Sequence, residues 1–226
     1  MKLFIDDADI NEIKRLYNLY PVDGVTTSPS ILSKQNRNPK EVLKEIREFI
    51  GKDTTLFAQV LPEGAEGMIE DALSITKVLG NNTVIKIPSI PEGFRAIRLL
   101  KEKGITTCGT VVYTPMQAYL AAKAGASYVA PYVNRIDNMG YDGVKVAKDI
   151  HDILIKNNLD CMVLAASFRN SQQVLELCKY GIGSCTCAPA IMDSLVKSAA
   201  VDDAIDVFIK EFNKLGSGKS MKDYFG

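Results

Sequence analysis

Segments typical of β-strands and of amphipathic helices alternate along nearly the whole chain. The strand-like segments are short and rich in Val, Ile, Thr and aromatic residues, whereas apolar residues recur every three or four positions in the other segments. Eight strand-like segments occupy residues 3–6, 24–27, 55–60, 83–88, 106–113, 128–133, 162–167 and 184–188. The helical segments occupy residues 9–20, 39–50, 66–79, 93–103, 115–124, 143–156, 171–180, 190–198 and 201–214. Because parallel strands need long crossover connections, this alternation predicts repeated βαβ units.

Eight such units in 226 residues fit a (β/α)8 TIM barrel, since barrels of this kind run about 200–250 residues as one domain. The main alternative is a doubly wound open sheet, which usually has a glycine-rich phosphate loop after its first strand. Here an acidic segment, residues 6–9, follows the first strand and favours the barrel. We therefore expect a single α/β barrel domain over residues 1–226, in which residues 200–226 add a C-terminal helix and tail.

The composition argues against several classes of function. The 27 basic and 27 acidic residues give a net charge of zero and form no long basic run, which argues against nucleic acid and membrane-surface partners. No apolar stretch approaches the roughly 18 residues of a membrane span, and an acidic pair follows Ile5 too early for a secretory signal. The single histidine, His151, argues against histidine-based triads and multi-histidine metal sites. We expect a protein of the cytoplasm.

The five cysteines are odd in number and match no zinc-binding spacing. Two of them lie two residues apart in one strand-like segment, where a strain-free disulfide is rare. In a reducing cytoplasm we expect all five to be small core residues. They are Cys108, Cys161, Cys178, Cys185 and Cys187.

Lys86 stands inside segment 83–88, which otherwise has the composition of a buried strand. Burial removes water from an ammonium group, and desolvation lowers the pKa of a lysine because the charged form is penalised. A neutral amine near pH 7 attacks carbonyl groups and forms a Schiff base. The alternative is a lysine that reaches solvent or pairs with a carboxylate. This segment alone leaves both interpretations open and makes Lys86 a candidate nucleophile.

Polar residues gather where the predicted strands end, which is where barrel active sites lie. Strand parity places Val84 and Lys86 on one face, which we assign to the barrel interior, so that Ile85 and Ile87 pack outward. The same parity pairs Phe4 with Asp6 and Phe57 with Gln59. The polar strand ends are Asp6, residues 26–30, Gln59, Lys86, Thr110, Tyr113, residues 132–135 and residues 167–169.

Several of these segments together resemble the small transaldolase family. The matching motifs are Phe4-Ile5-Asp6, Gly24-Val25-Thr26-Thr27-Ser28-Pro29-Ser30, Phe57-Ala58-Gln59-Val60, Val84-Ile85-Lys86-Ile87-Pro88, Tyr128-Val129-Ala130-Pro131-Tyr132-Val133-Asn134-Arg135 and Leu164-Ala165-Ala166-Ser167-Phe168-Arg169. The resemblance runs from residue 1 to about residue 214, and the combination is specific although each motif alone is weak. It implies a class I aldolase mechanism in which Lys86 forms the Schiff base, with no metal and no organic cofactor.

Within this family two activities occur, transaldolase and fructose-6-phosphate aldolase. Transaldolases typically have a glutamate in strand three and a phenylalanine in strand six, where this chain has Gln59 and Tyr132 as the aldolases do. The strand-five segment 109–113 also resembles the aldolase pattern. A glutamine orients a water by hydrogen bonds but does not titrate, so proton transfer is left to Tyr132 with Thr110 and Asp6.

The resemblance also implies a substrate site for a sugar phosphate. Arginine suits a phosphate because its guanidinium is permanently charged and binds in a bidentate way. Loops after the seventh and eighth strands often hold a phosphate in these barrels. The expected substrate-binding residues are Thr26, Ser28, Asn134, Arg135, Ser167 and Arg169.

Four of these assignments keep a structural alternative. The family usually has an asparagine at Ser28, which either weakens hydroxyl recognition here or leaves the serine as a turn residue. Asp6 either binds a hydroxyl and relays a proton, or pairs with the lysine or caps the next helix. Gln59 is alternatively a strand-end polar group bonded to backbone. Arg135 is alternatively an ion-pair partner of Asp137 or a contact with a neighbouring subunit.

We expect a Schiff-base aldolase that cleaves or forms the C3–C4 bond of fructose 6-phosphate. The alternative with the same mechanism is a transaldolase that moves a dihydroxyacetone unit between sugar phosphates in the pentose phosphate pathway. The alternative of another class is a barrel that binds sugar phosphates without covalent chemistry. Exposed apolar residues in segment 201–226 suggest packing on a neighbouring subunit, and the resemblance implies a homo-oligomer, a pentamer or decamer.

Overall fold

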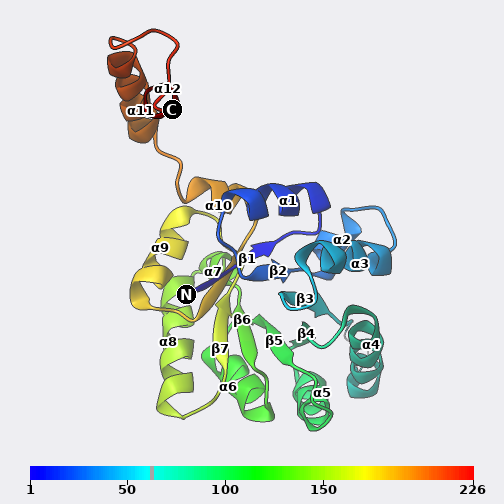
Figure 1. The fold of residues 1–226 in the computed structure, drawn as a ribbon. Helices are drawn as coiled ribbons and strands as arrows, with labels where there is room; N and C mark the ends of the chain where they lie inside the picture. Colours follow the sequence, from blue (N-terminus) through cyan, green and yellow to red (C-terminus); the bar gives the residue numbers. More distant parts are fainter. Residues whose placement is uncertain (62–63) are drawn as a thin grey trace. The chain divides into compact units, whose positions relative to one another are not determined.

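The computed structural model describes residues 1–61 and 64–226, and it confirms a closed eight-stranded barrel. All neighbouring strands are parallel, and their order around the ring follows the sequence. Within residues 1–192, Figure 1 shows the longer helices arranged around the strands. The strands are β1 (Lys2–Asp6), β2 (Gly24–Thr26), β3 (Thr55–Gln59), β4 (Thr83–Pro88), β5 (Thr107–Val112), β6 (Tyr128–Pro131), β7 (Met162–Ala165) and β8 (Ser184–Cys187).

The helices begin and end at residues that suit those positions. For example, Thr114 and Gln117 form a capping box at the start of α6, and Gly125 ends that helix in the left-handed conformation. The helices are α1 (Ile10–Leu19), α2 (Pro29–Ser33), α3 (Pro39–Ile50), α4 (Gly64–Leu79), α5 (Pro91–Glu102), α6 (Pro115–Ala124), α7 (Val133–Asp137), α8 (Gly143–Lys156), α9 (Ser171–Tyr180), α10 (Pro189–Ser194), α11 (Ala199–Phe212) and α12 (Lys222–Phe225).

The main differences from the sequence-based elements are at the carboxyl ends of the strands. The predicted strand over residues 128–133 is wrong in its last part, because β6 ends at Pro131 and α7 begins at Val133. The predicted helix over residues 190–198 likewise ends early, at Ser194. The short helices α2, α7 and α12 were not predicted, since four or five residues are too few to show a helical period.

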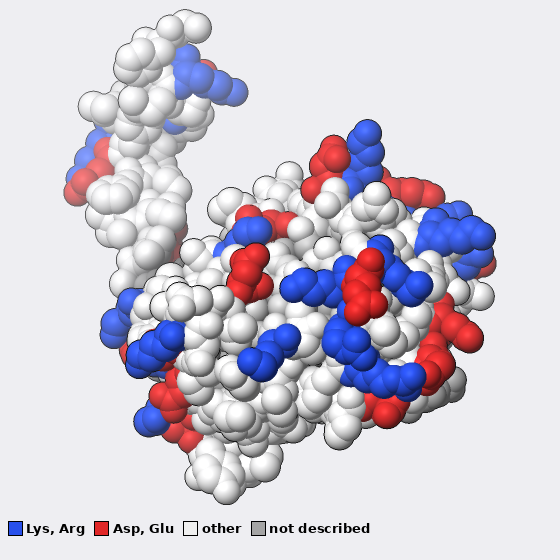
Figure 2. Space-filling model, turned by 90° about the horizontal axis from the view of Figure 1, so that it is seen from below, with Lys and Arg blue, Asp and Glu red and all other residues white. Residues whose placement is uncertain are grey.

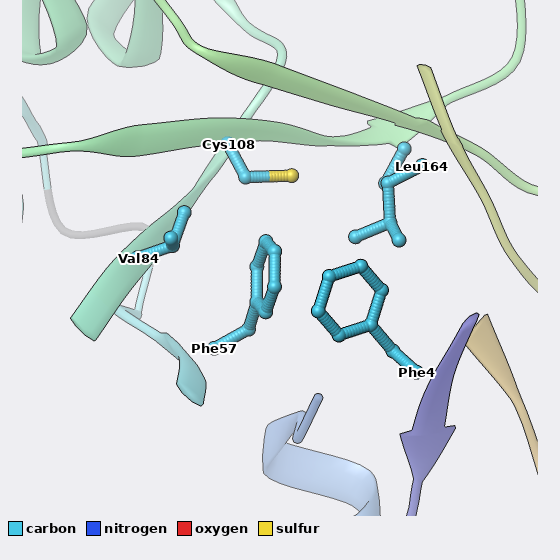
Figure 3. Packing of buried hydrophobic residues seen from close by; sticks show 6 residues of the cluster. Phe4, Phe57, Val84, Cys108 and Leu164 are labelled. Carbon is cyan, nitrogen blue, oxygen red and sulfur yellow. The ribbon is translucent and has the colours of Figure 1, made fainter. Parts of the chain in front are cut away.

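The lower interior of the barrel is apolar and is filled from six strands. The buried residues of this layer are Phe4, Phe57, Val84, Cys108, Ala130 and Leu164. Figure 3 shows the two phenylalanine rings at its centre, and their centroids lie 5.2 Å apart in an edge-to-face arrangement. The position of Val84 confirms the predicted interior face, and the alternating residues Ile85 and Ile87 are fully buried on the face toward the helices.

The prediction that all five cysteines are core residues is wrong for one of them. Cys108, Cys185 and Cys187 are buried and Cys161 is partly buried, but Cys178 is exposed on α9. A helix offers a solvent-facing side at every turn, so a single apolar residue in a helical segment does not by itself indicate burial.

Charges of both signs cover the surface of the barrel. Figure 2 shows Lys and Arg side chains interspersed with Asp and Glu on one of its faces, as the zero net charge suggests. Some of these charges link adjacent helices: Arg95 of α5 contacts Glu66 of α4 at 2.6 Å. Within residues 1–61 and 64–226, no helix combines the length and apolar character that a membrane crossing requires.

The chain divides into two compact units, Met1–Met192 with the barrel and Asp193–Gly226 with α11 and α12. In the second unit the ring of Phe212 packs edge-to-face on that of Tyr224, and the Tyr224 hydroxyl donates to the carbonyl of Leu215. None of the residues of α11 is buried. This unit therefore has a small internal contact and a large exposed apolar surface.

Candidate active site

A pocket of about 210 Å³ lies at the carboxyl ends of the strands, above the apolar layer. It forms because the inward-facing residue changes from apolar to polar two positions further along several strands, as in Phe4 to Asp6 and Val84 to Lys86. The polar and charged residues of its lining are Asp6, Ser28, Ser30, Lys34, Lys86, Tyr132, Arg135, Ser167 and Thr186. These groups make it the chemically richest cavity among the described residues.

A second cavity, of about 430 Å³, lies at the other end of the barrel. Its lining includes Tyr128 and Met162 at the starts of β6 and β7, with His151 of α8. It is larger, but it holds no lysine and none of the predicted site residues. The smaller pocket around Lys86 is therefore the candidate active site.

Lys86 is 6% exposed and lines the pocket from the middle of the barrel mouth. Its Nζ donates a hydrogen bond to the backbone carbonyl of Thr27 at 2.9 Å, rather than to a carboxylate. That carbonyl is itself fixed, because the Thr27 amide and hydroxyl both donate to the carbonyl of Phe57. The Lys86 amine is therefore fixed by the backbone at the place where it lines the pocket.

Asp6 enters the pocket beside Lys86 and is held by a pair of threonines. The Thr26 hydroxyl donates to Asp6 Oδ1 at 2.6 Å, and it also lies 2.6 Å from the Thr186 hydroxyl. The Thr186 hydroxyl also donates to the backbone carbonyl of Phe4 at 3.4 Å. Burial raises the pKa of the Asp6 carboxyl above its usual range, and the nearby Lys86 and the Thr26 hydrogen bond only partly oppose that rise.

Thr110 and Tyr132 meet at the rim of the pocket. Their hydroxyl oxygens lie 3.0 Å apart, and the Tyr132 backbone amide donates to the carbonyl of Val112 at 3.1 Å. The guanidinium of Arg135 lies over the Tyr132 ring, 4.6 Å from its centroid. The phenol is therefore held at its hydroxyl, at its ring and at its backbone.

A bulge in β5 shapes this corner. Gly109 pairs with Val129 of β6, but Val112 pairs with Pro131, so β5 holds one extra residue between the two pairs. The extra residue is Val111, whose φ of 58° lies in the left-handed region that β-branched residues seldom adopt. Such strain is typical of functional sites.

The bulge reverses the inward and outward alternation of β5. In an unbroken strand Thr110 and Val112 would face inward, and Tyr113 would face the helices. Because Val112 instead shares a register and a face with Pro131, Tyr113 turns toward the barrel mouth. Its ring packs edge-to-face on that of Tyr132, with centroids 5.8 Å apart. Sequence analysis treated Tyr113 only as a polar strand end, and no pattern there signalled the bulge.

Gln59 pairs in register with Lys86 on the neighbouring strand. It does not line the Lys86 pocket, and instead borders a groove of about 320 Å³ together with Leu32, Leu43 and Leu79. Its Oε1 atom is buried without a hydrogen-bond partner among the described residues. This oxygen can accept a hydrogen bond, and buried polar atoms in native proteins nearly always have a hydrogen-bond partner.

Arg135 reaches the pocket from the first turns of α7, and that helix is firmly anchored. The carboxylate of Asp137 accepts the Gly143 amide at 2.7 Å and the Gln173 side-chain amide at 2.6 Å. Gln173 in turn accepts the backbone amide of Arg169. Asp137 therefore anchors α7 through these two hydrogen bonds, and no ion pair between it and Arg135 occurs among residues 1–61 and 64–226. Arg135 lines the pocket.

Ser167 lines the pocket in the loop after β7, with a left-handed φ of 62°. Its carbonyl accepts the backbone amide of Asn134, which ties this loop to α7. The side chains of Asn134 and Arg169 do not line the pocket, and Arg169 is exposed. Helix α9 begins at Ser171, four residues beyond Ser167.

Ser28 occupies the turn position that the sequence analysis gave as one alternative, and its contact with a substrate hydroxyl stays a prediction. Its hydroxyl accepts the Ile31 amide and so caps α2, while the residue also lines the pocket. Two lining residues were missed by the sequence analysis. Thr186 lies between two cysteines in β8. It pairs in register with Phe4, whose side chain faces the barrel interior, so Thr186 also faces the interior. Lys34 follows α2, which was itself not predicted.

The whole sequence from residue 3 to residue 222 matches the family described as "Transaldolase/Fructose-6-phosphate aldolase". The chain belongs to this family. The expected family resemblance is therefore confirmed, and the protein is an enzyme of the aldolase or transaldolase type.

Solved structures with the same fold are more distant in sequence. A structure described as "Native KDPGal structure" matches at 15% identity and a TM-score of 0.59, over 83% of this chain and 82% of that one. Thiamine phosphate pyrophosphorylase from Pyrococcus furiosus matches at 17% identity and a TM-score of 0.58, over 84% and 87%. A cube-shaped protein cage designed by fusing symmetric oligomeric domains matches at 15% identity and a TM-score of 0.62, over 100% of this chain and 89% of that one. At these identities the three confirm the barrel fold alone.

Proposed function

We propose that the protein is a Schiff-base aldolase that cleaves and forms the C3–C4 bond of fructose 6-phosphate. The observation that carries this proposal is the position of Lys86, an amine in the middle of a buried strand that still lines the pocket. Membership of the transaldolase/fructose-6-phosphate aldolase family supports it independently.

The amine of Lys86 adds to the C2 carbonyl of the ketose, and loss of water from the carbinolamine gives an iminium. A base removes the proton of the C4 hydroxyl, the C3–C4 bond breaks, and its electron pair moves to the iminium nitrogen. Glyceraldehyde 3-phosphate leaves, and a three-carbon enamine stays on the lysine. Protonation at C3 and addition of water then release dihydroxyacetone and restore the amine.

Proton transfers in this scheme fall to the groups around Lys86. Asp6, with a pKa raised by burial, is suited to exchange a proton during formation and loss of the carbinolamine. The Tyr132 hydroxyl, bonded to that of Thr110, is suited to act on the C4 hydroxyl. Gln59 stays a prediction as the residue that orients a water, since it does not line this pocket. Thr26 keeps the Asp6 carboxylate aligned.

Arg135 and Ser167 form the proposed phosphate site at the β6 and β7 side of the mouth. The guanidinium supplies a permanent charge, and the serine supplies a hydroxyl donor. Ser28 is left to contact a substrate hydroxyl from the β2 side. Asn134 and Arg169 stay predictions as substrate-binding residues, since they lie near this corner without lining the pocket.

A transaldolase would use the same imine but pass the enamine to a second aldehyde. The experiment that separates the two supplies fructose 6-phosphate alone, and then with erythrose 4-phosphate. We expect the protein to release glyceraldehyde 3-phosphate from fructose 6-phosphate alone. The rate of this release should not depend on the second aldehyde. Turnover that appears only with erythrose 4-phosphate would assign the protein as a transaldolase.

The exposed apolar surface of residues 199–226 supports a homo-oligomer, with five or ten subunits as the proposed sizes. Phe208 and Phe225 are 67% and 78% exposed, and a large exposed apolar patch marks an interaction site. Removal of residues 217–226 is expected to change the sedimentation coefficient toward a smaller species. An unchanged sedimentation profile would contradict this role for the tail. A cytoplasmic location stays a prediction.

A further inference from the structure

A chain of four oxygen atoms runs from the Asp6 carboxyl through two threonines to the backbone of β1. The Thr26 hydroxyl lies 2.6 Å from Asp6 Oδ1 and also 2.6 Å from the Thr186 hydroxyl. The Thr186 hydroxyl lies 3.4 Å from the carbonyl oxygen of Phe4. Thr26 and Thr186 are only 0% and 2% exposed, so these contacts form one connected, buried network.

The number of hydrogens in this chain depends on the charge of Asp6. Each threonine hydroxyl has one hydrogen to donate, whereas the chain contains three oxygen–oxygen contacts. When Asp6 is ionised, two hydrogens serve three contacts, and one contact has none. When Asp6 is protonated, the carboxyl donates to Thr26, Thr26 donates to Thr186, and Thr186 donates to the carbonyl of Phe4. All three contacts are then hydrogen bonds.

Thr186 lets the Thr26 hydroxyl turn its hydrogen away from Asp6. An ionised Asp6 accepts that hydrogen, but a protonated Asp6 donates to Thr26, whose own hydrogen then needs another acceptor. The Thr186 oxygen, 2.6 Å away, is that acceptor. We propose that Thr186 is a positioning residue for Asp6, because it accepts the Thr26 hydrogen whenever Asp6 carries a proton. This inference rests on the proposed function for the part that Asp6 has in proton transfer.

Other groups also act on the proton of Asp6. Burial raises the pKa of this carboxyl. The charged and titratable groups that face it are Lys86 of β4, Arg135 of α7, the adjacent Asp7 and the thiol of Cys187 on β8. The two basic groups oppose the rise in the pKa, and the adjacent carboxylate adds to it. Since all of these groups stay in place when the Thr186 hydroxyl is removed, a comparison of variants isolates the contribution of that hydroxyl.

An infrared titration tests the protonation of Asp6 without requiring turnover. A carboxylic acid and a carboxylate absorb at different frequencies, and subtraction of the Asp6→Asn spectrum identifies the band of Asp6. Thr186→Val removes the acceptor but keeps the shape of the side chain. The midpoint of the Asp6 titration should fall by about 0.5–1 pH unit in this variant, because the protonated state loses one hydrogen bond. The same midpoint in the wild-type protein and in Thr186→Val would overturn the proposal.

Two further variants at this position separate the hydroxyl from the packing of the side chain. Thr186→Ser keeps a hydroxyl and should keep the wild-type midpoint. Thr186→Cys offers only a weak sulfur acceptor and should lower the midpoint, so the test does not depend on the folding of the valine variant. A midpoint that falls as far in Thr186→Ser as in Thr186→Val would overturn the proposal.

Thr107→Val is the matched control. Thr107 is a buried threonine of β5 that does not line the pocket, and its hydroxyl has no hydrogen-bond partner within residues 1–61 and 64–226. The variant should leave the midpoint unchanged. A fall as large as that in Thr186→Val would mean that any buried Thr→Val change alters the titration, and this too would overturn the proposal.

Turnover separates this inference from the proposed function. The part of the pH profile of kcat/KM that reports Asp6 should move to lower pH in Thr186→Val and not in Thr186→Ser. Cleavage of fructose 6-phosphate without a shift of the Asp6 midpoint in Thr186→Val would overturn the positioning role and leave the proposed function standing. A shifted midpoint without cleavage of fructose 6-phosphate would instead support the positioning role and contradict the aldolase.

Discussion

Two layers of the barrel interior lie only two residues apart on each strand, yet they serve different purposes. The lower layer contains Phe4 and Phe57 in edge-to-face contact and is closed to solvent. The upper layer contains Asp6, Lys86 and Thr110 on the same faces of the same sheet. The lower layer consists of packed apolar side chains. The upper layer contains hydrogen-bonded and charged groups and a residue with a strained backbone, Val111.

The difference shows how the barrel makes a buried amine tolerable. The lower layer packs apolar side chains beneath Lys86, and the upper layer supplies a fixed hydrogen-bond acceptor for its amine, the Thr27 carbonyl. If this division holds, substitutions in the lower layer should change stability, and substitutions in the upper layer should change turnover.

Lys86→Met should have the largest effect on turnover. The side chain is similar in length but has no amine, so the imine cannot form, and kcat should fall at least about 10³-fold. Its free energy of unfolding should change little, because an apolar group replaces a polar one above an apolar layer. Steady-state kinetics and urea unfolding measure the two quantities. Retention of even a tenth of the activity would remove Lys86 from the mechanism.

Phe57→Ala should have the largest effect on stability. Loss of a fully buried ring costs about 3–5 kcal/mol, because a cavity remains in the layer. Phe57→Leu is the matched control and should cost less. At a temperature where both variants are folded, kcat per folded molecule should fall far less than in Lys86→Met. A kcat loss as large as that of Lys86→Met would erase the distinction between the layers.

Tyr113→Leu tests whether the β5 bulge matters for chemistry. Loss of the aromatic contact should leave Tyr132 less well oriented and lower kcat by about fivefold. Tyr113→Phe keeps the ring and should behave like the wild-type enzyme. In a Tyr132→Phe background the Tyr113→Leu change should have no further effect on kcat. Fully additive losses would show that Tyr113 acts independently of Tyr132.

Asp6→Asn tests whether burial of this carboxyl in the upper layer makes the free energy of unfolding depend on pH. Because the pKa of Asp6 is raised in the folded state, the folded protein binds more protons than the unfolded one above the ordinary aspartate pKa of about 3.9. This group's contribution to stability therefore falls as the pH rises from that value through the raised pKa. The variant should lack this loss and gain stability relative to wild type at neutral pH. Parallel curves of unfolding free energy against pH for the two proteins would contradict the assigned shift.

Much of the fold was predictable because it depends on repeated local patterns. The alternation of segments predicted all eight strands, and parity predicted that Val84 and Lys86 share the interior face. Most of the site was predictable for the same reason, since strand ends meet at one mouth: Asp6, Lys86, Tyr132 and Arg135 do lie around one pocket.

The remainder depends on features without a sequence pattern. The bulge at Val111 arises from pairing between strands, and a valine in the sequence does not predict a left-handed backbone. Lys34 reached the pocket only because a five-residue helix follows β2. Thr186 was overlooked because its role depends on Thr26, a contact across 160 residues.

Reduction with borohydride tests the central claim most directly. The protein is treated with borohydride in the presence of dihydroxyacetone, digested, and examined by mass spectrometry. We predict an irreversible mass gain of one reduced three-carbon unit on the peptide that contains Lys86, and none in Lys86→Met. A gain on another lysine, or no gain under conditions where the substrate is turned over, would contradict the account.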